Sequence, residues 1–424
     1  MAASVPDDFQ ARGLVADASE GWRDHLETGS RTLYVGFDPT ADSLHVGSLL
    51  PLLALRRAQL AGHRPIVLVG GGTGLIGDPS GKSGERALNP KDVVHEWAER
   101  LKRQVSPFLD FDGGRVSAVL ADNYEWISEL DVLSLLRDVG KHFSVGAMLA
   151  RESVKARLQT GISYTEFSYQ VLQAYDFLCL RRRYDCTMQM GGSDQWGNIT
   201  AGIELIRRIE GGPAFGLTLP LVTKGDGSKF GKTESGTIWL DPDRTSAYEM
   251  YQFWLNTADR DAIAFLKYFT FLPAERIEEL REATRTSPER REAQRVLAQE
   301  VTALVHGPEG ARQAEATSAS LFGGQRADGL SAGEAPGAVL PTEARSWPLW
   351  KLLAAAVEQA GPQMSTSEAR RLIQQGGVEV DGVRAGGIDQ QTPPGPHTVK
   401  VGKRRIYRVI VEGADSSSGS SQGA

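Results

Sequence analysis

The chain has 424 residues, of which 41% are hydrophobic and 24% charged, and this length indicates two or three domains rather than one core. The formal net charge of −6 excludes a protein that is basic throughout, so any contact with nucleic acid must be regional. Two cysteines are too few for a disulfide scaffold, and we find neither a signal-peptide pattern nor an apolar run long enough to span a membrane. We therefore expect a cytoplasmic protein.

Short apolar runs alternate with helical periodicity between residues 32 and 240. This pattern is typical of a parallel sheet covered by helices, so we predict an α/β domain over 1–240 with a Rossmann-like, doubly wound parallel sheet. The predicted strands and helices are, in order, strands 33–37, 65–69 and 116–120 and helices 49–60 and 92–109. The second helix should have Asn89 as its cap and Pro90 at its first position.

The remainder of the chain changes character twice. Helices alone are predicted in a subdomain over 241–306, namely 246–255, 259–268, 274–284 and 288–305, the last opened by Ser287 and Pro288. The Gly-, Ala- and Pro-rich stretch 307–345 is expected to be a linker and the Ser-rich tail 414–424 to be disordered. Between them, 346–413 should form a small α+β module with a helix at 367–375, a strand and tight turn within 376–383, and a strand pair within 400–411. This module has nine Lys or Arg against six Asp or Glu, a net charge of +3, so it is the natural place for RNA.

One glycine-rich run resembles a nucleotide-binding motif. GTGLIG at 72–77 follows a predicted strand and formally fits the dinucleotide pattern, but Asp78 and Pro79 follow where the helix should continue. The P-loop pattern fails as well, because its first glycine would have to be Ile76. What remains is a loop with one acid, Asp78, and two cations, Lys82 and Arg86.

Two other segments suit phosphates. HVGS at 45–48 opens the predicted helix 49–60, and a histidine and a glycine at a helix start favour phosphate oxygens because free N–H groups point at them. Far downstream, KGDGSKFGKT at 224–233 is a glycine-rich loop with Lys229 and Lys232, suited to cover a polyphosphate.

Together these segments resemble a known family. HVGS at 45–48 and KFGKT at 229–233 are similar to the two signatures of the class I aminoacyl-tRNA synthetases, His-Ile-Gly-His and Lys-Met-Ser-Lys-Ser. The match is closest to the tyrosyl-tRNA synthetases of the bacterial type, over the runs 34–47, 71–82, 169–176, 189–198 and 229–233. The resemblance covers most of residues 10–310, and the C-terminal module resembles an RNA-binding module of a small-subunit ribosomal protein.

The resemblance implies a tyrosine site. Tyr34 and Asp176 would hold the phenol, Asp78, Tyr169 and Gln173 the ammonium, and Gln195 the carboxylate. Helical spacing supports part of this set, since Tyr169, Gln173 and Asp176 fall at i, i+4 and i+7 on one face of a helix.

The resemblance also implies an ATP site. His45 and Thr40 would contact the phosphates, and the departing pyrophosphate would attract Lys82, Arg86, Lys229 and Lys232. Gly47 would let the adenine approach. The other residues expected along ATP are Asp38, Ser48, Gly192, Asp194, Phe230, Gly231 and Thr233. Mg²⁺ is expected to arrive with ATP, and no protein metal site is predicted. Ser48 in place of the last His of the signature should tune the ATP affinity without abolishing activity.

The expected activity is tyrosine–tRNA ligation, with tyrosine, ATP and tRNA(Tyr) as partners, no membrane, and a homodimer with 130–145 as a plausible interface. Two alternatives stay open. One is a tryptophan-specific sister enzyme, against which the pairing of Tyr34 with Asp176 speaks. The other is an RNA-binding factor that has the synthetase shape and no catalysis.

Overall fold

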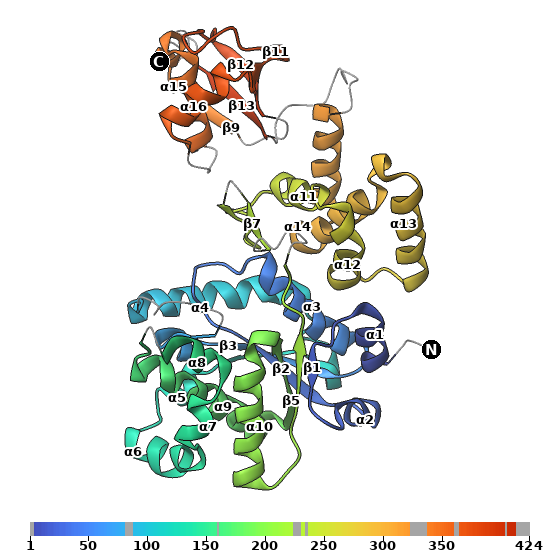
Figure 1. The fold of residues 1–424 in the computed structure, drawn as a ribbon, viewed down its shortest axis with the longest axis vertical. Coiled ribbons are helices and arrows are strands. Elements are labelled where there is room, and N and C mark those ends of the chain that lie inside the picture. Colours follow the sequence, from blue (N-terminus) through green and yellow to red (C-terminus); the bar gives the residue numbers. More distant parts are fainter. Residues whose placement is uncertain are drawn as a thin grey trace, which may run out of the picture. The chain divides into compact units, whose positions relative to one another are not determined.

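The computed structural model describes residues 4–80, 88–158, 161–223, 230–233, 236–322, 337–359, 364–402 and 405–412 (Figure 1). The chain divides into two compact units. The first combines residues 1–231, 238–245 and 254–305, and the second combines 232–237, 246–253 and 306–424. The predicted helical subdomain 241–306 is thus shared between the two units.

A six-stranded sheet forms the centre of the first unit. Its order is β1 (Asp17–Ala18), β6 (Phe215–Leu219), β5 (Cys186–Gly192), β2 (Thr32–Phe37), β3 (Arg64–Val69), β4 (Val119–Asp122). All neighbours are parallel except β1, which runs antiparallel to β6 at the edge. From β2 the chain adds β3 and β4 on one side and then β5 and β6 on the other, so the order reverses between β2 and β5. The prediction of a doubly wound parallel sheet is confirmed.

Helices cover both faces of this sheet (Figure 1). On one face, α3 (Val46–Leu60) contacts β2 and β3, and α4 (Lys91–Val105) contacts β3. On the other, α9 (Tyr164–Tyr184) and α10 (Trp196–Glu210) pack on β5 and on each other. On this second face, Phe177 of α9, Leu205 of α10 and Tyr34 of β2 belong to one hydrophobic core. Strand residues alternate between the faces, which is why Tyr34 points toward α9 while its neighbours face α3.

The smaller helices of this unit complete its surface. They are α1 (Val5–Arg12), α2 (Trp22–Glu27), α5 (Tyr124–Ile127), α6 (Val132–Ser134), the π-helical turn Leu135–Val139, α7 (Val145–Leu149), α8 (Glu152–Leu158), α12 (Asp259–Phe269) and α13 (Ala274–Thr286).

Several predicted boundaries are wrong. α3 begins at Val46 rather than at residue 49, and α4 begins at Lys91 because Pro90 has an extended ψ of 147° and therefore precedes the helix instead of opening it. The strand predicted at 116–120 starts only at Val119, after a 3-10 turn. The helix predicted from Pro288 begins after Arg291, whose φ of 50° separates it from a 3-10 turn.

The second unit contains the hairpin of β7 (Lys232–Thr233) and β8 (Gly236–Thr237), most of α11 (Ala247–Leu255) and the later part of α14 (Glu292–Phe322). α14 is kinked at Gly307, where φ is 79°. The segment 307–345, predicted to be a linker, has regular structure at both of its ends. Helix continues to Phe322, and β9 (Gly337–Leu340) belongs to the C-terminal sheet.

The C-terminal module is a five-stranded sheet with two helices. The strand order is β11 (Val383–Arg384), β10 (Val378–Val380), β12 (Gly395–Val401), β13 (Arg405–Val411), β9. The helices α15 (Leu349–Gln359) and α16 (Thr366–Gln374) share an apolar core with this sheet. β10 and β11 are joined at Asp381 and Gly382, both with positive φ, so the predicted strand and tight turn are confirmed.

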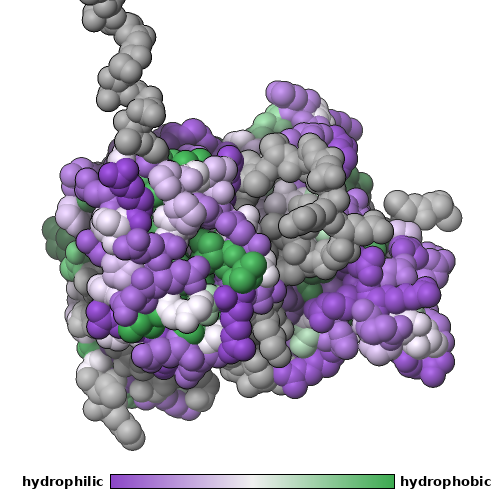
Figure 2. Space-filling model, turned by 90° about the horizontal axis from the view of Figure 1, so that it is seen from above, coloured by the Kyte–Doolittle hydropathy of each residue, from purple (hydrophilic) through white to green (hydrophobic). Residues whose placement is uncertain are grey.

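Within the described parts of the chain, no helix combines the length and the apolar character that crossing a bilayer requires. Figure 2 shows one face of the molecule, on which hydrophilic residues dominate and hydrophobic ones form small separate patches.

Candidate active site

The strand order of the sheet reverses between β2 and β5. In doubly wound sheets, ligands bind outside the carboxyl ends of the strands at this point. Tyr34 pairs in register with Gln189 of β5, and the chain leaves β2 through Asp38 and leaves β5 through Gly192. The predicted tyrosine and ATP residues of these two strands therefore lie at one edge of the sheet.

α9 supplies three of the expected tyrosine residues from one face. Tyr169 and Asp176 are buried and Gln173 is half-buried, as the i, i+4, i+7 spacing predicts. The start of α9 is fixed by Ser163, whose side chain accepts from the N–H of Glu166. Glu166 also forms an ion pair of 2.8 Å with Arg157 of α8, with both side chains 2% exposed. Because breaking such a buried pair is costly, it holds this end of α9 in place.

Asp176 occupies the phenol end of the expected tyrosine site. Its Oδ1 accepts from Trp126 Nε1 at 2.7 Å and its Oδ2 from Asn123 Nδ2 at 2.9 Å. Burial raises the pKa of Asp176 to about 8, although both hydrogen bonds act in the opposite direction. A carboxyl group of this kind can hold or release a proton near neutral pH.

The hydroxyl of Tyr34 has no hydrogen-bond partner among the described residues, although the side chain is fully buried. Burial raises the pKa of Tyr34 well above its usual value, and Asp176 adds to this by its charge. A buried hydroxyl without a partner costs free energy, so a ligand group that pairs with it is favoured. This is what the hydroxyl of a bound phenol would do.

The ammonium end is built around Gln195. Its Nε2 donates to Asp78 Oδ2 at 2.7 Å, and its Oε1 accepts from Gln173 Nε2 and from Asn198 Nδ2, each at 3.2 Å. Gln173 Oε1 is buried with no hydrogen-bond partner in the described part of the chain. A carboxylate and an unpaired amide oxygen together suit a cationic donor. The structure thus brings the residues expected at the amino acid's backbone into one network.

Asp38 lies closer to the tyrosine residues than the sequence suggests. It accepts from the Tyr169 hydroxyl at 2.7 Å and from Thr73 Oγ1 at 2.7 Å. Asp38 was expected along the adenosine side, and in the structure it ties the end of β2 to α9 and to the glycine-rich loop. These hydrogen bonds fix the Tyr169 hydroxyl as a donor, and the Asp38 carboxylate raises the pKa of that hydroxyl further after burial.

Asn123 is a central residue that the sequence analysis missed. It directly follows β4 and is 0% exposed. Its Oδ1 accepts from the N–H of Gly72 at 2.7 Å, and its Nδ2 donates to Thr73 Oγ1 at 2.8 Å as well as to Asp176. The sequence signal for Asn123 was the pair Asp122-Asn123 shortly after a predicted strand, and such a pair is also common in turns. Trp126, which donates to Asp176, was missed as well.

The first signature forms the start of α3. His45 is the N-cap residue, and its Nδ1 accepts from the N–H of Gly47 at 3.0 Å. A Cβ atom at position 47 would lie 2.6 Å from His45 Cε1, so only glycine leaves the imidazole in this place. Thr40 and His45 are exposed and Ser48 is partly exposed. The N–H groups of Val46, Gly47 and Ser48 already donate to Ile238 O, His45 Nδ1 and His45 O, so it is the exposed side chains of Thr40 and His45 that are accessible to an anion here.

The second signature meets the first through its described part. A Cβ at Gly231, where φ is 79°, would lie 2.9 Å from Val46 Cγ2. Gly231 O accepts from the N–H of Ile238, and Ile238 O accepts from the N–H of Val46, both at 3.0 Å. The two signatures are thus neighbours in space, as the resemblance implies. Of the cations expected around ATP, Lys82, Arg86 and Lys229 fall outside the described residues, and only the backbone of Lys232 and Thr233 is described.

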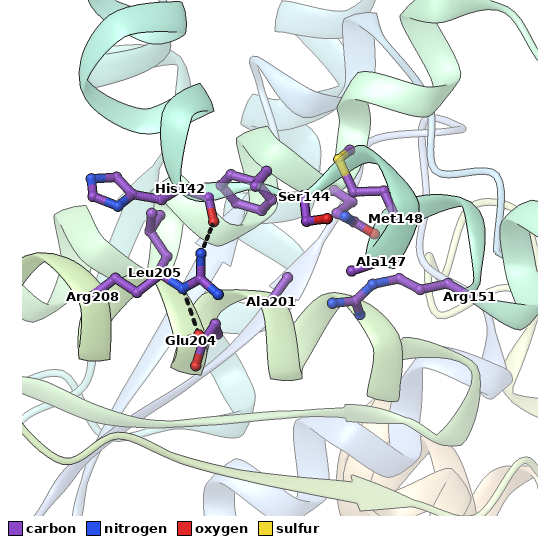
Figure 3. Close-up of a pocket in the computed structure, with 11 residues that line it drawn as sticks. His142, Ser144, Ala147, Met148, Arg151, Ala201, Glu204, Leu205 and Arg208 are labelled. Atoms are coloured by element: carbon purple, nitrogen blue, oxygen red, sulfur yellow. Dashed lines mark hydrogen bonds and ion pairs between the residues drawn. The ribbon is translucent and has the colours of Figure 1, made fainter.

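A separate pocket lies between α10 and the segment 142–148 (Figure 3). Its volume is about 70 Å³, below the 300 Å³ or more of a typical ligand site. Arg208 spans it, donating to the carbonyl of His142 at 2.8 Å and pairing with Glu204. None of the predicted substrate residues lines it. In the described ranges we also find no cluster of three or more His, Cys, Asp or Glu that could hold a metal ion.

Comparison with known proteins decides the family. Residues 26–323 match the model of the class I tRNA synthetases for tryptophan and tyrosine, and residues 353–386 match the S4 domain. A tyrosine–tRNA ligase of Desulfitobacterium hafniense is 54% identical over 393 residues, covering 90% of this chain and 92% of its own. This chain belongs to the bacterial tyrosine–tRNA ligase family of class I synthetases. A second member, from Geobacillus kaustophilus, is 56% identical over 385 residues and covers 89% of this chain and 91% of its own.

Solved structures agree with this family. A truncated mitochondrial tyrosyl-tRNA synthetase of Aspergillus nidulans aligns with a TM-score of 0.68 and 32% identity, covering 75% of this chain and 94% of its own. A tryptophanyl-tRNA synthetase of Encephalitozoon cuniculi aligns with a TM-score of 0.53 and 14% identity, over 72% and 87% of the two chains. At that identity the second comparison shows a shared fold only.

Proposed function

We propose that this chain activates L-tyrosine with ATP and then transfers the tyrosine to the 3′-terminal adenosine of tRNA(Tyr). The observation that carries the choice of amino acid is the unpaired, fully buried hydroxyl of Tyr34, which interacts electrostatically with Asp176. Tyrosine would supply the missing hydrogen bond, whereas phenylalanine would leave the Tyr34 hydroxyl unpaired. Tryptophan has no hydroxyl to place there, which argues against the sister enzyme.

The tyrosine backbone would be held by the Gln195 network. Asp78, Tyr169 and the free oxygen of Gln173 would surround the ammonium, and Gln195 would orient the carboxylate. Gln195 is suited to this because it already joins Asp78 and Gln173 by hydrogen bonds. These residues are supplied by a loop and by α9 and need little rearrangement to receive the ligand, which favours affinity.

ATP would lie over the start of α3, between the two signatures. His45, Thr40, Gly47 and Ser48 would face its phosphates. The further contacts would come from Asp38, Gly192, Asp194, the backbone of Phe230, Gly231 and Thr233 and from the cations Lys82, Arg86, Lys229 and Lys232. A carboxylate oxygen of tyrosine forms a bond to the α-phosphorus while the bond from that phosphorus to the bridging oxygen breaks, and pyrophosphate leaves with the electron pair.

Positioned donors and cations suffice for this step, since charge grows on the phosphoryl oxygens and on pyrophosphate and no proton has to be removed. Loss of one such contact should cost about 2 to 4 kcal/mol of barrier. Mg²⁺ would enter as the complex with ATP and supply further neutralisation of the phosphates. In the second step a ribose hydroxyl of the tRNA attacks the acyl carbon, and AMP leaves.

The C-terminal module would hold the tRNA. It carries exposed cations on both helices, including Lys351 on α15 and Arg370 and Arg371 on α16. The guanidinium of Arg370 lies 4.0 Å from the centre of the Trp350 ring. Exposed cations and flat side chains suit phosphates and unstacked bases. The helices between 246 and 305 would add further contacts to the tRNA. We place the enzyme in the cytoplasm, where tRNA and ATP are available.

A homodimer is supported by the distribution of apolar surface. Seven of the twelve large hydrophobic residues that are exposed in the described part of the chain fall between 132 and 164. They are Val132, Leu133, Leu136, Val145, Leu149, Leu158 and Tyr164. Such a concentration is unusual on a monomer and marks a protein contact. Four of these seven residues lie within the predicted interface segment 130–145. The others extend the surface to the start of α9, the helix whose residues are proposed to bind tyrosine.

Exchange of labelled pyrophosphate into ATP tests the proposal when it is run with tyrosine, tryptophan and phenylalanine in parallel. We expect exchange with tyrosine alone. Exchange with tryptophan would identify the sister activity, and no exchange by a protein that still binds tRNA would identify an RNA-binding factor without catalysis.

A further inference from the structure

Phe230 takes the position of methionine in the second signature, and its ring packs against other aromatic side chains. It lies in a group of three other rings that all come from the helices after the signature. The ring centres are 5.5 Å from Phe269, 5.2 Å from Phe265 and 5.7 Å from Trp254. The Phe269 ring is stacked on Phe230 with an interplanar angle of 11°, and the Phe265 ring meets it edge-on.

The three receiving rings form a packed socket. Trp254 and Phe269 are 0% exposed and Phe265 is 5% exposed. They also contact each other, with centre distances of 4.9 Å between Trp254 and Phe269 and 6.0 to 6.2 Å for the other two pairs. Aromatic pairs at these separations and angles stabilise one another beyond simple burial, so the socket holds its shape.

The socket is also fixed to α3. Phe269 is the last residue of α12, and the carbonyl of the next residue, Thr270, accepts from Arg57 of α3 and from Arg12 of α1. The Arg57 guanidinium further lies 4.5 Å from the centre of the Phe271 ring. α3 therefore contacts the end of α12 near its own C-terminal end, while the first signature forms its N-terminal end.

The residue after Phe230 completes the link. Gly231 passes over the first turn of α3, close to Val46, and is bonded to it through Ile238. The second signature is thus fixed at two successive residues. The ring of Phe230 lies in the socket, and the backbone of Gly231 lies close to α3. Loss of the ring would remove one of these two restraints, and the glycine that provides the other restrains its neighbours least.

We propose that the ring of Phe230 is a positioning group for adenylate formation, which holds the backbone at Phe230 and Gly231 on the first turn of α3 and does not itself touch the substrate. This inference rests on the proposed function. Because the contacts of the signature act on the leaving pyrophosphate, displacement of its backbone should slow the chemical step and leave tyrosine binding intact.

The test measures the single-turnover rate of tyrosyl-adenylate formation, the KM for ATP and the equilibrium Kd for tyrosine in the full-length enzyme. Phe230→Ala should slow adenylate formation by about 10- to 100-fold. Its Kd for tyrosine should stay within about two-fold of wild type, since the Tyr34 and Gln195 networks are untouched. Phe230→Met should bring the rate back to within about five-fold of wild type, because a thioether of similar volume fills the same socket.

Tyr268→Leu is the matched control. Its ring lies against the outer side of the socket, 6.4 Å from Phe269, and comes from the same helix. It should leave the rate within about two-fold. If Phe230→Ala is insoluble, Phe265→Leu loosens the socket from its other wall and should slow adenylate formation with the same unchanged Kd.

The inference is overturned if Phe230→Ala or Phe265→Leu reacts at the wild-type rate, if Phe230→Met is as slow as Phe230→Ala, or if tyrosine binding falls together with the rate. It is also overturned if Tyr268→Leu is slowed equally. A wild-type protein that forms no adenylate would instead refute the proposed function itself.

Discussion

The indole N–H of Trp126 donates a 2.7 Å hydrogen bond to Asp176 and so joins α5 to α9 inside the core. Asn123 donates to the other oxygen of the same carboxyl group. With both oxygens held and the side chain buried, Asp176 keeps a fixed orientation toward the place where the tyrosine phenol is proposed to bind. Its ionisation then becomes a sensitive probe of ligand binding.

We expect tyrosine binding to release a proton near neutral pH. Burial raises the pKa of Asp176 from 3.8 to about 8, so the free protein is largely protonated there at pH 7. A phenol that donates to Asp176 favours the carboxylate and should lower this pKa. Calorimetric titration at pH 7 in two buffers of different ionisation enthalpy measures the release. Asp176→Asn should release none, and a wild-type protein that releases none either would contradict the assignment.

The raised pKa of Asp176 also predicts how the free energy of unfolding changes with pH. The folded protein keeps the proton to a higher pH than the unfolded chain, so this contribution to the free energy of unfolding is fully present at about pH 4 and is lost as the pH rises toward 8. Urea unfolding of the wild type and of Asp176→Asn over this range isolates it. The difference between the two proteins should change with pH in this direction, and a pH-independent difference would show that the carboxyl is ionised throughout.

Tyr34→Phe should separate stability from specificity. The hydroxyl is buried and unpaired in the free protein, so its removal should stabilise the fold by about 1 kcal/mol or leave it unchanged. The preference for tyrosine over phenylalanine should fall by about ten-fold, since one hydrogen bond to the phenol is lost. Unfolding curves and parallel pyrophosphate-exchange assays measure the two effects. A destabilised variant with unchanged preference would mean that Tyr34 is a core residue only.

Asn123→Ala tests the residue that the sequence analysis missed. The substitution leaves the N–H of Gly72 and one oxygen of Asp176 without their partner, so we expect a loss of about 2 to 3 kcal/mol in unfolding free energy and a weaker tyrosine affinity. Gln59→Ala is the control, because Gln59 is also a buried amide but bonds to the backbone of Asp110 and Val116, outside the proposed site. Equal effects of both variants on tyrosine binding would argue against a special role for Asn123.

The proposed dimer surface predicts a monomeric variant. Leu133 and Val132 are 77% and 69% exposed, so replacing both with Asp should not disturb the fold but should prevent association. Sedimentation velocity should show a monomer, while Leu60→Asp, equally exposed at the end of α3, should leave the dimer intact. A wild-type monomer, or a dimer in the double variant, would contradict the assignment of this surface.

Charge reversal on α16 separates the two steps of the reaction. Arg370→Glu with Arg371→Glu should leave pyrophosphate exchange unchanged and reduce tRNA charging by more than about ten-fold at low salt, and the difference from wild type should become smaller at higher salt. Removal of 346–424 should have the same qualitative effect. Undiminished charging by the charge-reversed protein would mean that the tRNA is held elsewhere.

The sequence predicted the sheet and the helix that carries three of the proposed tyrosine residues for clear reasons. Buried strands and helices leave a periodic apolar signal, and residues 169, 173 and 176 share a helix face by arithmetic alone. Asn123 and Trp126 leave no such signal. Their role depends on β4 and α9 meeting in space, and an isolated Asn after a strand is ordinary in a turn.

The errors in the element boundaries also have physical causes. Gly307 and Pro308 correctly indicate a break, since φ there is 79°, but a proline is well tolerated in a first helical turn and the helix resumes at once. The strand β9 was missed because its short apolar run has no partner nearby in sequence. It pairs with β13, the last strand of the module.

That pairing has a consequence for synthesis of the protein. β13 lies between β12 and β9, and β9 has no other neighbour in the described sheet. The sheet of the C-terminal module can therefore be completed only after Arg405–Val411 has left the ribosome. The six-stranded sheet that contains Tyr34 is complete once residue 219 has emerged. During synthesis, the sheet that carries the proposed tyrosine site could therefore form well before the sheet of the module that is proposed to bind tRNA.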